Sequence, residues 1–273
     1  MRRDLVTYRS LGEPDRAALA ELLHEGGPAD AYLSHTLLES GPRGFHGCFE
    51  GERLFGALWN RQGALSAAAC TPPESATVLA GRLRHRDHWG SVVGPALPCT
   101  AIADALLDGG TPRVHRRQAF MVARRADELG PGEPRLEQAQ RADVDALVPL
   151  VARYRVEDGL ARPTDDHRGW IREHIAGRIR GGHLFLVRDG GQIVFTGAFT
   201  FLGAAGAGLG GIYTVPEARG RGLAGRATAS LARQALEVGP CLTLHVAPDN
   251  EPAFRSYRRA GLCAAGDFRL TFR

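Results

Sequence analysis

The sequence contains no lysine, so all 34 of its basic residues are arginines. They stand against 30 acidic residues, which leaves a net charge of +4. No block of five or more like charges occurs, and this argues against a nucleic-acid-binding arm. We therefore expect no nucleic-acid partner, while the small positive excess suits an anionic small ligand.

Long apolar runs are also absent. Nowhere do about 18 apolar residues follow one another, which is the length that spans a bilayer. The opening stretch MRRDLVTYRSLGEPD is charged and has no apolar core of signal-peptide length. We expect a cytoplasmic protein with no membrane partner.

Disulfides and metal sites are not indicated either. The cysteines are odd in number, lie far apart and are never spaced C-x-x-C, which predicts reduced thiols. His85 and His88 have no third ligand in view, so no metal is expected. The five cysteines are Cys48, Cys70, Cys99, Cys241 and Cys263.

The chain divides at LGPGEP, where Pro and Gly interrupt both helix and strand patterns. The sequence therefore predicts a linker at 129–134 between a first domain at 1–128 and a second at 135–273. Helical and strand periodicities alternate in both, which predicts a mixed α/β fold. In the second domain a short strand at 136–140 is followed by the order α, α, β, β, β, α, β, α, β, with Asp165 or Asp166 opening the second helix.

The first half repeats much of this order. Each half has a predicted hairpin, around Glu50-Gly51-Glu52 and around Asp189-Gly190-Gly191. The stretches TPPESATVLAGRL and TVPEARGRGLAGRATASL each follow a strand, contain Pro-Glu and enter a helix, which favours two copies of one unit. Residues 74–78 lack the glycines and arginines of the second copy, so only the second copy is equipped to bind phosphate.

The segment RGRGLAGRA, residues 219–227, has two interpretations. Its glycines form G-x-G-x-x-G, the spacing of a dinucleotide turn, and Arg219, Gly222 and Ala224 form R-x-x-G-x-A, the spacing of an acyl-CoA pyrophosphate loop. Both use backbone N–H groups at a helix N-terminus, where the dipole favours negative charge. In a dinucleotide fold the first glycine follows its strand directly and a long series of βα units comes after it. Here residues 216–219 intervene and few residues follow, which favours the acyl-CoA loop.

Downstream, residues 247–262, APDNEPAFRSYRRAGL, meet the pattern N-x-x-A-x-x-x-Y-x-x-x-G-[FL]. The two motifs in this order resemble the GNAT superfamily of acyl-CoA-dependent N-acyltransferases, from about residue 135 to the end. A degenerate first copy ahead of an intact second one resembles a group of bacterial tandem GNAT proteins. The resemblance implies a two-domain GNAT-like fold and an acyl-CoA co-substrate, most simply acetyl-CoA, without a metal.

The resemblance also implies roles for particular residues. The loop amides would bind the CoA pyrophosphate, and the preceding strand would pair with the pantetheine arm. The Tyr257 hydroxyl would protonate the departing thiolate. The implied cofactor-binding residues are Ile212, Tyr213, Thr214, Val215, Arg219, Gly220, Arg221, Gly222, Leu223, Ala224, Gly225, Asn250 and Tyr257.

The general base is less evident, because residues 206–215 carry no ionisable group except Tyr213. Glu157 and His245 are the candidates, and for each the alternative is an ordinary structural role. Asn250 suits a helix cap as well as a contact to CoA. Trp170 suits either packing in the core or lining the acceptor pocket.

The expected function is transfer of an acyl group to a primary amine of a small molecule or peptide. The alternative is a non-catalytic acyl-CoA-binding or scaffolding protein, favoured by the missing strand carboxylate. Acceptor identity, acyl chain length and a monomeric or homodimeric state remain open.

Overall fold

The computed structural model describes residues 6–83, 89–162, 164 and 167–273. His85, His88, Asp165 and Asp166 lie outside the described residues, so the expectations placed on them stay predictions. The chain forms two compact units, each built from separate stretches of sequence. Unit 1 comprises Met1–Phe120, His245–Asp249 and Ala264–Arg273, and unit 2 comprises Met121–Leu244 and Asn250–Cys263. The predicted linker at 129–134 lies within unit 2, and a boundary between two sequence copies at this point stays a prediction.

Unit 1 is a mixed sheet with helices on both faces. Its strands follow the order β1-β2-β3-β4-β5-β12-β6, and β4 pairs parallel with β5 whereas the neighbouring pairs β1·β2, β2·β3, β3·β4 and β5·β12 are antiparallel. The strands are β1 (Val6–Ser10), β2 (Phe45–Glu50), β3 (Arg53–Arg61), β4 (Ala64–Ala67), β5 (Ser91–Pro95), β6 (Val114–Ala123) and β12 (Cys263–Phe272). The helices are α1 (Arg16–Glu25), α2 (Ala31–Ser40), α3 (Pro73–Leu83) and α4 (Ala96–Leu107), with short 3-10 turns at Glu13–Asp15 and Gly27–Asp30.

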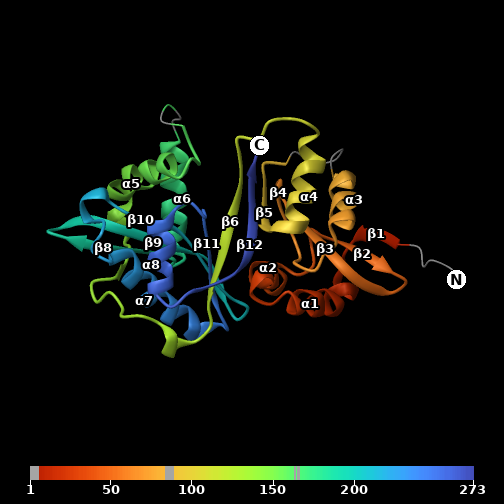
Figure 1. Ribbon diagram of the computed structural model, residues 1–273, viewed down its shortest axis with the longest axis horizontal. Helices are drawn as coiled ribbons and strands as arrows, with labels where there is room; N and C mark the ends of the chain where they lie inside the picture. Colours follow the sequence, from red (N-terminus) through yellow and green to blue (C-terminus); the bar gives the residue numbers. More distant parts are fainter. Residues whose placement is uncertain (1–5, 84–88, 163, 165–166) are drawn as a thin grey trace. The chain divides into compact units, whose positions relative to one another are not determined.

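The alternation of side chains along β3 explains why both faces of this sheet are covered. Leu58 is buried in a cluster with α3 and α4, whereas its neighbours Ala57 and Trp59 are buried in a cluster with α1 and α2. Figure 1 shows the two helix pairs along the strands β2 to β5. The sheet is therefore apolar on both faces, as expected for an α/β unit.

Unit 2 has the same kind of construction. Its strands follow the order β11-β10-β9-β8-β7, with β10 and β11 parallel and the other pairs antiparallel. The strands are β7 (Glu137–Gln138), β8 (Leu184–Asp189), β9 (Gln192–Gly203), β10 (Gly206–Thr214) and β11 (Leu242–Val246). The helices are α5 (Val144–Glu157), α6 (Arg168–Arg180), α7 (Leu223–Val238) and α8 (Glu251–Arg259), with 3-10 turns at Ala126–Glu128, Arg141–Asp143 and Pro216–Ala218. None of the helices among the described residues has the length and apolar character needed to cross a membrane.

Helices again cover both faces of the sheet. Leu186 packs in a cluster with α5 and α6, and its neighbour Val187 packs in a second cluster with Leu223 and Ala227 of α7. The predicted hairpin between β8 and β9 is confirmed. Its turn residues Gly190 and Gly191 have φ of +56° and +81°, the left-handed conformations that a two-residue hairpin turn favours.

The predicted mixed α/β fold is confirmed, and the order of elements recurs within the two halves. Three antiparallel strands, a helix, a parallel strand and a second helix occur as β2 to α4 and again as β8 to α8. The sequence analysis missed α2 and α4. Pro95 and Pro98 punctuate the start of α4, a pattern that usually marks a loop but is compatible with a helix N-terminus.

The last strand, β12, pairs antiparallel with β5 from Phe268↔Pro95 to Phe272↔Ser91. The final strand of the chain therefore belongs to the sheet of unit 1, although the helix α8 that precedes it belongs to unit 2. Residues from both ends of the sequence are needed to complete unit 1.

Unit 1 contains a buried carboxylate whose ionisation should destabilise the fold. Asp30 is 0% exposed, and its two carboxylate oxygens accept the Ala69 N–H at 2.9 and 3.0 Å. Burial raises the pKa of Asp30 to about 7, against the lowering effect of the Ala69 N–H. Because the folded state binds this proton more tightly than the unfolded chain, the stabilising effect is complete below about pH 4 and is lost as pH rises towards 7.

We expect Asp30→Asn to remove this pH dependence while keeping an oxygen that accepts the Ala69 N–H. As pH rises from 5 to 8, the wild type should lose about 2 to 3 kcal/mol in free energy of unfolding relative to the variant. Urea unfolding of both proteins at the two pH values measures the difference. An equal change in the free energy of unfolding of both proteins between the two pH values would contradict the expectation.

Candidate functional site

The loop before α7 holds its backbone open to solvent. Arg219, Gly220, Arg221 and Gly222 are all exposed and connect the 3-10 turn at Pro216–Ala218 to the helix. Gly220 and Gly222 have φ of +78° and +73°, which side-chain-bearing residues rarely adopt. A Cβ at Gly220 would point into open space, so the loop is unobstructed at this residue.

The loop ends at the N-terminus of a long helix. The intrahelical ladder of α7 begins with the bond from the Arg226 N–H to the Gly222 carbonyl at 3.1 Å. The N–H groups of residues 223–225 therefore lack partners within the helix, and the helix dipole adds partial positive charge at the same place. Gly222, at the N-cap, has no side chain to compete for them. This end of α7 is suited to bind a phosphate group.

Arg219 is fixed by a network that includes Glu157. It donates from Nε to the Thr214 carbonyl at 2.9 Å and from Nη2 to Glu157 Oε2 at 2.7 Å. The Tyr213 hydroxyl donates to the other Glu157 oxygen at 2.8 Å, and Arg153 pairs with it at 3.1 Å. Desolvation acts to raise the pKa of Glu157, but the hydrogen bonds from Arg219 and Tyr213 outweigh it and hold the pKa below its ordinary value.

A second network braces the loop from the predicted linker, and sequence analysis missed it. Arg226 donates from Nη1 to the Arg221 carbonyl at 2.8 Å and from Nε to Glu133 Oε2 at 3.0 Å. Glu133 is 4% exposed and also pairs with Arg135 at 2.8 Å. Its backbone N–H donates to Ser230 of α7 at 2.9 Å. The linker segment is therefore packed on α7, and its carboxylate holds the arginine that orders the loop.

The strand before the loop separates from its parallel neighbour. Pairing between β10 and β11 runs from Ala207↔Leu242 to Leu209↔Leu244, whereas β10 continues to Thr214. On its other side, the register with β9 shifts between Gly210↔Ala198 and Tyr213↔Thr196. Gly211 and Ile212 form this bulge, and Gly211 has a φ of +61°. The bulge turns backbone groups out of the sheet next to the loop.

The downstream motif forms α8. The Asn250 side chain caps this helix by accepting the Ala253 N–H at 3.2 Å. Tyr257 is 7% exposed, and burial, with the nearby Tyr154 and Asp158, raises its pKa. The phenol is therefore a neutral proton donor throughout the physiological range. Gly225 lets α7 and α8 approach, since a Cβ there would lie 3.0 Å from the Ser256 carbonyl.

His245, the other candidate base, belongs to unit 1. Its ring packs edge to face against Phe120 and Phe268, with centroids 5.6 and 4.4 Å away. The side chain is exposed at the surface, yet desolvation by the surrounding protein lowers its pKa to about 4. The imidazole is therefore neutral at pH 7.

A cavity of about 130 Å³ lies in unit 2 beside the β10 bulge. Trp170 lines it and is 51% exposed, so this tryptophan does not pack in the core. The sequence analysis did not single out the other polar lining residues. They are Tyr154 and Arg155 of α5, His174 and Arg178 of α6, and Thr196 and Thr200 of β9.

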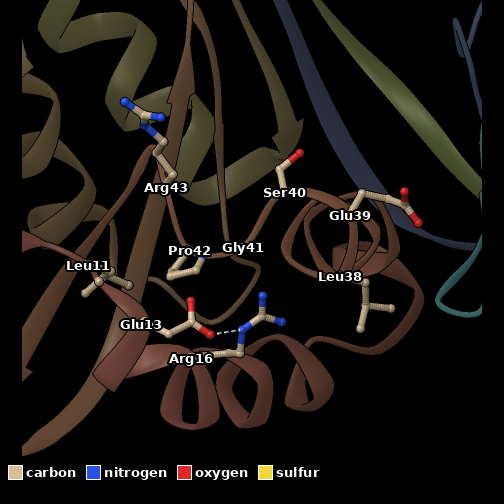
Figure 2. A pocket seen from close by; sticks show the side chains of 10 residues that line it. Leu11, Glu13, Arg16, Leu38, Glu39, Ser40, Gly41, Pro42 and Arg43 are labelled. Carbon is tan, nitrogen blue, oxygen red and sulfur yellow. Dashed lines mark hydrogen bonds and ion pairs between the residues drawn. The ribbon is translucent and has the colours of Figure 1, made fainter.

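Unit 1 has a second hollow, of about 540 Å³, between the start of α1 and the end of α2 (Figure 2). Arg16 pairs there with Glu13 at 2.6 Å, and both side chains are exposed. These two charges are thus already matched within the hollow. This feature resembles an open surface groove more than a preformed ligand-binding site.

The topology separates the two interpretations of the glycine loop. A dinucleotide fold requires an extended parallel sheet with the glycine turn directly after its first strand. Here β10 is antiparallel to β9, and the 3-10 turn at Pro216–Ala218 separates β10 from Gly220. The loop therefore belongs to a different architecture.

Comparison with known proteins likewise favours the acyl-CoA interpretation of the loop over the dinucleotide one. The family described as "Acetyltransferase (GNAT) family" matches residues 145–262. A GNAT-family acetyltransferase from Colwellia psychrerythraea is 14% identical with a TM-score of 0.57, covering 98% of this chain and 100% of that one. A GCN5-related N-acetyltransferase from Sphaerobacter thermophilus is 16% identical with a TM-score of 0.59, covering 98% and 95%. A tandem GNAT protein from the clavulanic acid biosynthesis pathway is 15% identical with a TM-score of 0.51, covering 98% and 97%. No curated protein matches the sequence. At these identities the structural likeness concerns the fold.

Proposed function

Because residues 145–262 form a domain of the GNAT acetyltransferase family, we propose that this protein transfers an acetyl group from acetyl-CoA to a primary amine. The family carries out acyl transfer from acyl-CoA. The observation that supports this activity most strongly here is the loop at 219–222, with two glycines at positive φ leading into the N-terminus of α7. A small-molecule amine is the proposed acceptor.

The loop suits the pyrophosphate of acyl-CoA by its own geometry. The N–H groups of residues 223–225 supply donors at this end of the helix, next to the exposed Arg219 and Arg221, which are paired with Glu157 and Asp189. Residues 212–215, which include the bulge residue Ile212 and the end of β10, would run alongside the pantetheine arm.

The chemistry follows from a direct attack. The amine nitrogen forms a bond to the thioester carbonyl carbon, and the oxyanion of the tetrahedral intermediate is stabilised by a backbone N–H of the bulge. As the C–S bond breaks, the Tyr257 hydroxyl gives its proton to the departing thiolate. The amine loses its surplus proton to a base or to water.

Glu157 is better suited to position Arg219 than to accept the amine proton. Both of its carboxylate oxygens accept hydrogen bonds, and its pKa is lowered rather than raised. A general base at neutral pH works best with a pKa near 7. His245, whose pKa is lowered to about 4, meets this criterion no better.

We expect a double-mutant cycle to couple Glu157 to Arg219. Glu157→Ala and Arg219→Ala should each raise the KM for acetyl-CoA by roughly three- to tenfold, and the double variant should be little worse than either single one. Steady-state kinetics over pH 6 to 9 measures both KM and the pH profile. If Glu157→Gln instead abolished the rise of kcat with pH, Glu157 would be the base.

Calorimetry with acetyl-CoA and with CoA tests the proposal directly. We expect binding at submillimolar concentration and CoA release when acetyl-CoA is incubated with amines. No binding would overturn the proposal. Binding without CoA release across a broad amine panel would favour a non-catalytic acyl-CoA-binding or scaffolding protein.

A further inference from the structure

The cavity beside the β10 bulge is lined by both aliphatic and basic side chains. Its aliphatic lining residues are Val151, Ile175, Leu184 and Ala198, from α5, α6, β8 and β9. Arg155, Trp170, His174 and Arg178 line it from α5 and α6. Gly210 and the bulge residue Gly211 also line the cavity, so its contents would adjoin the backbone that the proposed reaction uses.

Arg178 brings a positive charge into this cavity without an anionic partner among the described residues. Its Nη1 donates to the Phe199 carbonyl, and its Nε donates to His174 Nε2 at 3.3 Å. Both acceptors are neutral groups. Burial lowers the pKa of Arg178 from its ordinary value, but the guanidinium stays charged at any physiological pH. A partly buried charge held only by neutral acceptors is matched best by an anion from outside.

Thr196 provides an independent observation at the same cavity. Its residue is 1% exposed, and within the described part of the chain its hydroxyl has no hydrogen-bond partner. It lines the same cavity from β9. Buried hydroxyls are nearly always hydrogen-bonded, which makes this one a candidate partner for a polar ligand group.

The aromatic and imidazole rings pack beside the arginines without adding charge. Arg155 lies over the Trp170 ring at 4.7 Å, and the rings of Trp170 and His174 stack with centroids 5.0 Å apart. Desolvation, and then the charges of Arg178 and Arg155, lower the pKa of His174. The histidine is therefore neutral at pH 7, and the positive charge comes from the arginines. A guanidinium presents paired N–H donors that match a carboxylate.

We propose that the acceptor is a small aliphatic amino acid whose carboxylate binds Arg178. This rests on the proposed acetyl transfer and names its substrate class. The aliphatic side chain lies against Val151 and Leu184, the carboxylate pairs with Arg178, and the amino group faces the bulge at Gly210 and Gly211. The Thr196 hydroxyl donates to or accepts from the polar end of the ligand.

The test compares acceptors that differ only in the carboxylate. Alanine, valine and leucine are each assayed beside their methyl esters and beside ethylamine, isobutylamine and isopentylamine, with product detected by mass spectrometry. At least one acid should show a kcat/KM at least tenfold above its ester and its decarboxylated amine. An ester amine is less basic than the amine of its acid, so intrinsic reactivity at neutral pH favours the ester rather than the acid.

Substitutions test whether Arg178 causes this preference for the acid over its ester. Arg178→Met should lower kcat/KM for the acid by roughly ten- to a hundredfold and leave the ester within threefold, while Arg178→Lys should keep part of the preference. Arg180→Met, the same change at an exposed arginine of the same helix, should behave as the wild type. Thermal melting of all variants checks that the fold is retained.

The outcomes separate this inference from the proposed function. Acetylation of esters or decarboxylated amines as fast as the acids, or a preference that survives in Arg178→Met, overturns the assignment of the acceptor and leaves acetyl transfer standing. Absence of acetyl-CoA binding by calorimetry overturns both.

Discussion

Gly222→Asp is expected to lower the affinity for acetyl-CoA by roughly two to four powers of ten. Gly222 has a φ of +73° at the N-cap of α7, where the helix presents its free N–H groups. A carboxylate at this position places negative charge where the pyrophosphate would lie and offers those N–H groups a competing acceptor. Charge repulsion and lost amide contacts together would cost several kcal/mol. Calorimetric titration with CoA and acetyl-CoA measures the effect.

Two control variants separate charge from backbone strain. Gly51, in the β2–β3 turn of unit 1, has a φ of +60° and open space around its Cβ position, as an exposed turn glycine does. Gly51→Asp therefore adds the same charge at a similar φ in the other unit, and should leave CoA affinity unchanged. Gly222→Ala should show a smaller loss than Gly222→Asp. NAD or NADP binding that disappeared in Gly222→Asp, in a protein that never bound CoA, would show that the acyltransferase assignment is wrong.

Tyr257→Phe should lower kcat by roughly ten- to a thousandfold while changing CoA affinity by less than about threefold. The change removes one hydroxyl from a buried side chain and keeps its aromatic ring. Because burial raises the pKa of Tyr257, the wild-type rate should show no loss at alkaline pH from ionisation of this phenol up to about pH 10. Steady-state kinetics from pH 6 to 10, with calorimetry for the affinity, provides both measurements.

Tyr8→Phe is the matched control, since Tyr8 lies on β1 in unit 1. It should have wild-type kinetics. A Tyr257→Phe protein with undiminished kcat would remove the phenol from the mechanism and leave water as the proton donor.

Local sequence patterns were sufficient to predict parts of this site. The glycine spacing of residues 219–225 predicted a loop entering a helix, and Asn250, three residues before Ala253, caps α8 as its residue type allows. The glycine pair at 190–191 predicted its hairpin for the same reason. In each case the controlling interaction lies within a few residues, so a sequence window contains it.

Other parts depend on contacts between distant segments. Glu133 stands in a Pro/Gly-rich stretch typical of a linker, but it is buried against Arg226, far along the chain. Arg178 and Thr196 share a cavity only because α6 packs on the sheet next to the β10 bulge. The pairing of β12 with β5 likewise has no local indication, since the alternation of residues within a strand does not identify its partner.

That pairing has a consequence for synthesis of the protein. Strand β5 ends at Pro95, but its antiparallel partner β12 begins at Cys263, so the edge of β5 stays open until most of the chain has left the ribosome. At about 5 to 20 residues per second this interval is on the order of ten to thirty seconds. An unpaired strand edge is prone to wrong pairing with other chains. We infer that unit 1 finishes folding only after unit 2 has been translated, and that nascent chains depend on protection of β5 during this interval.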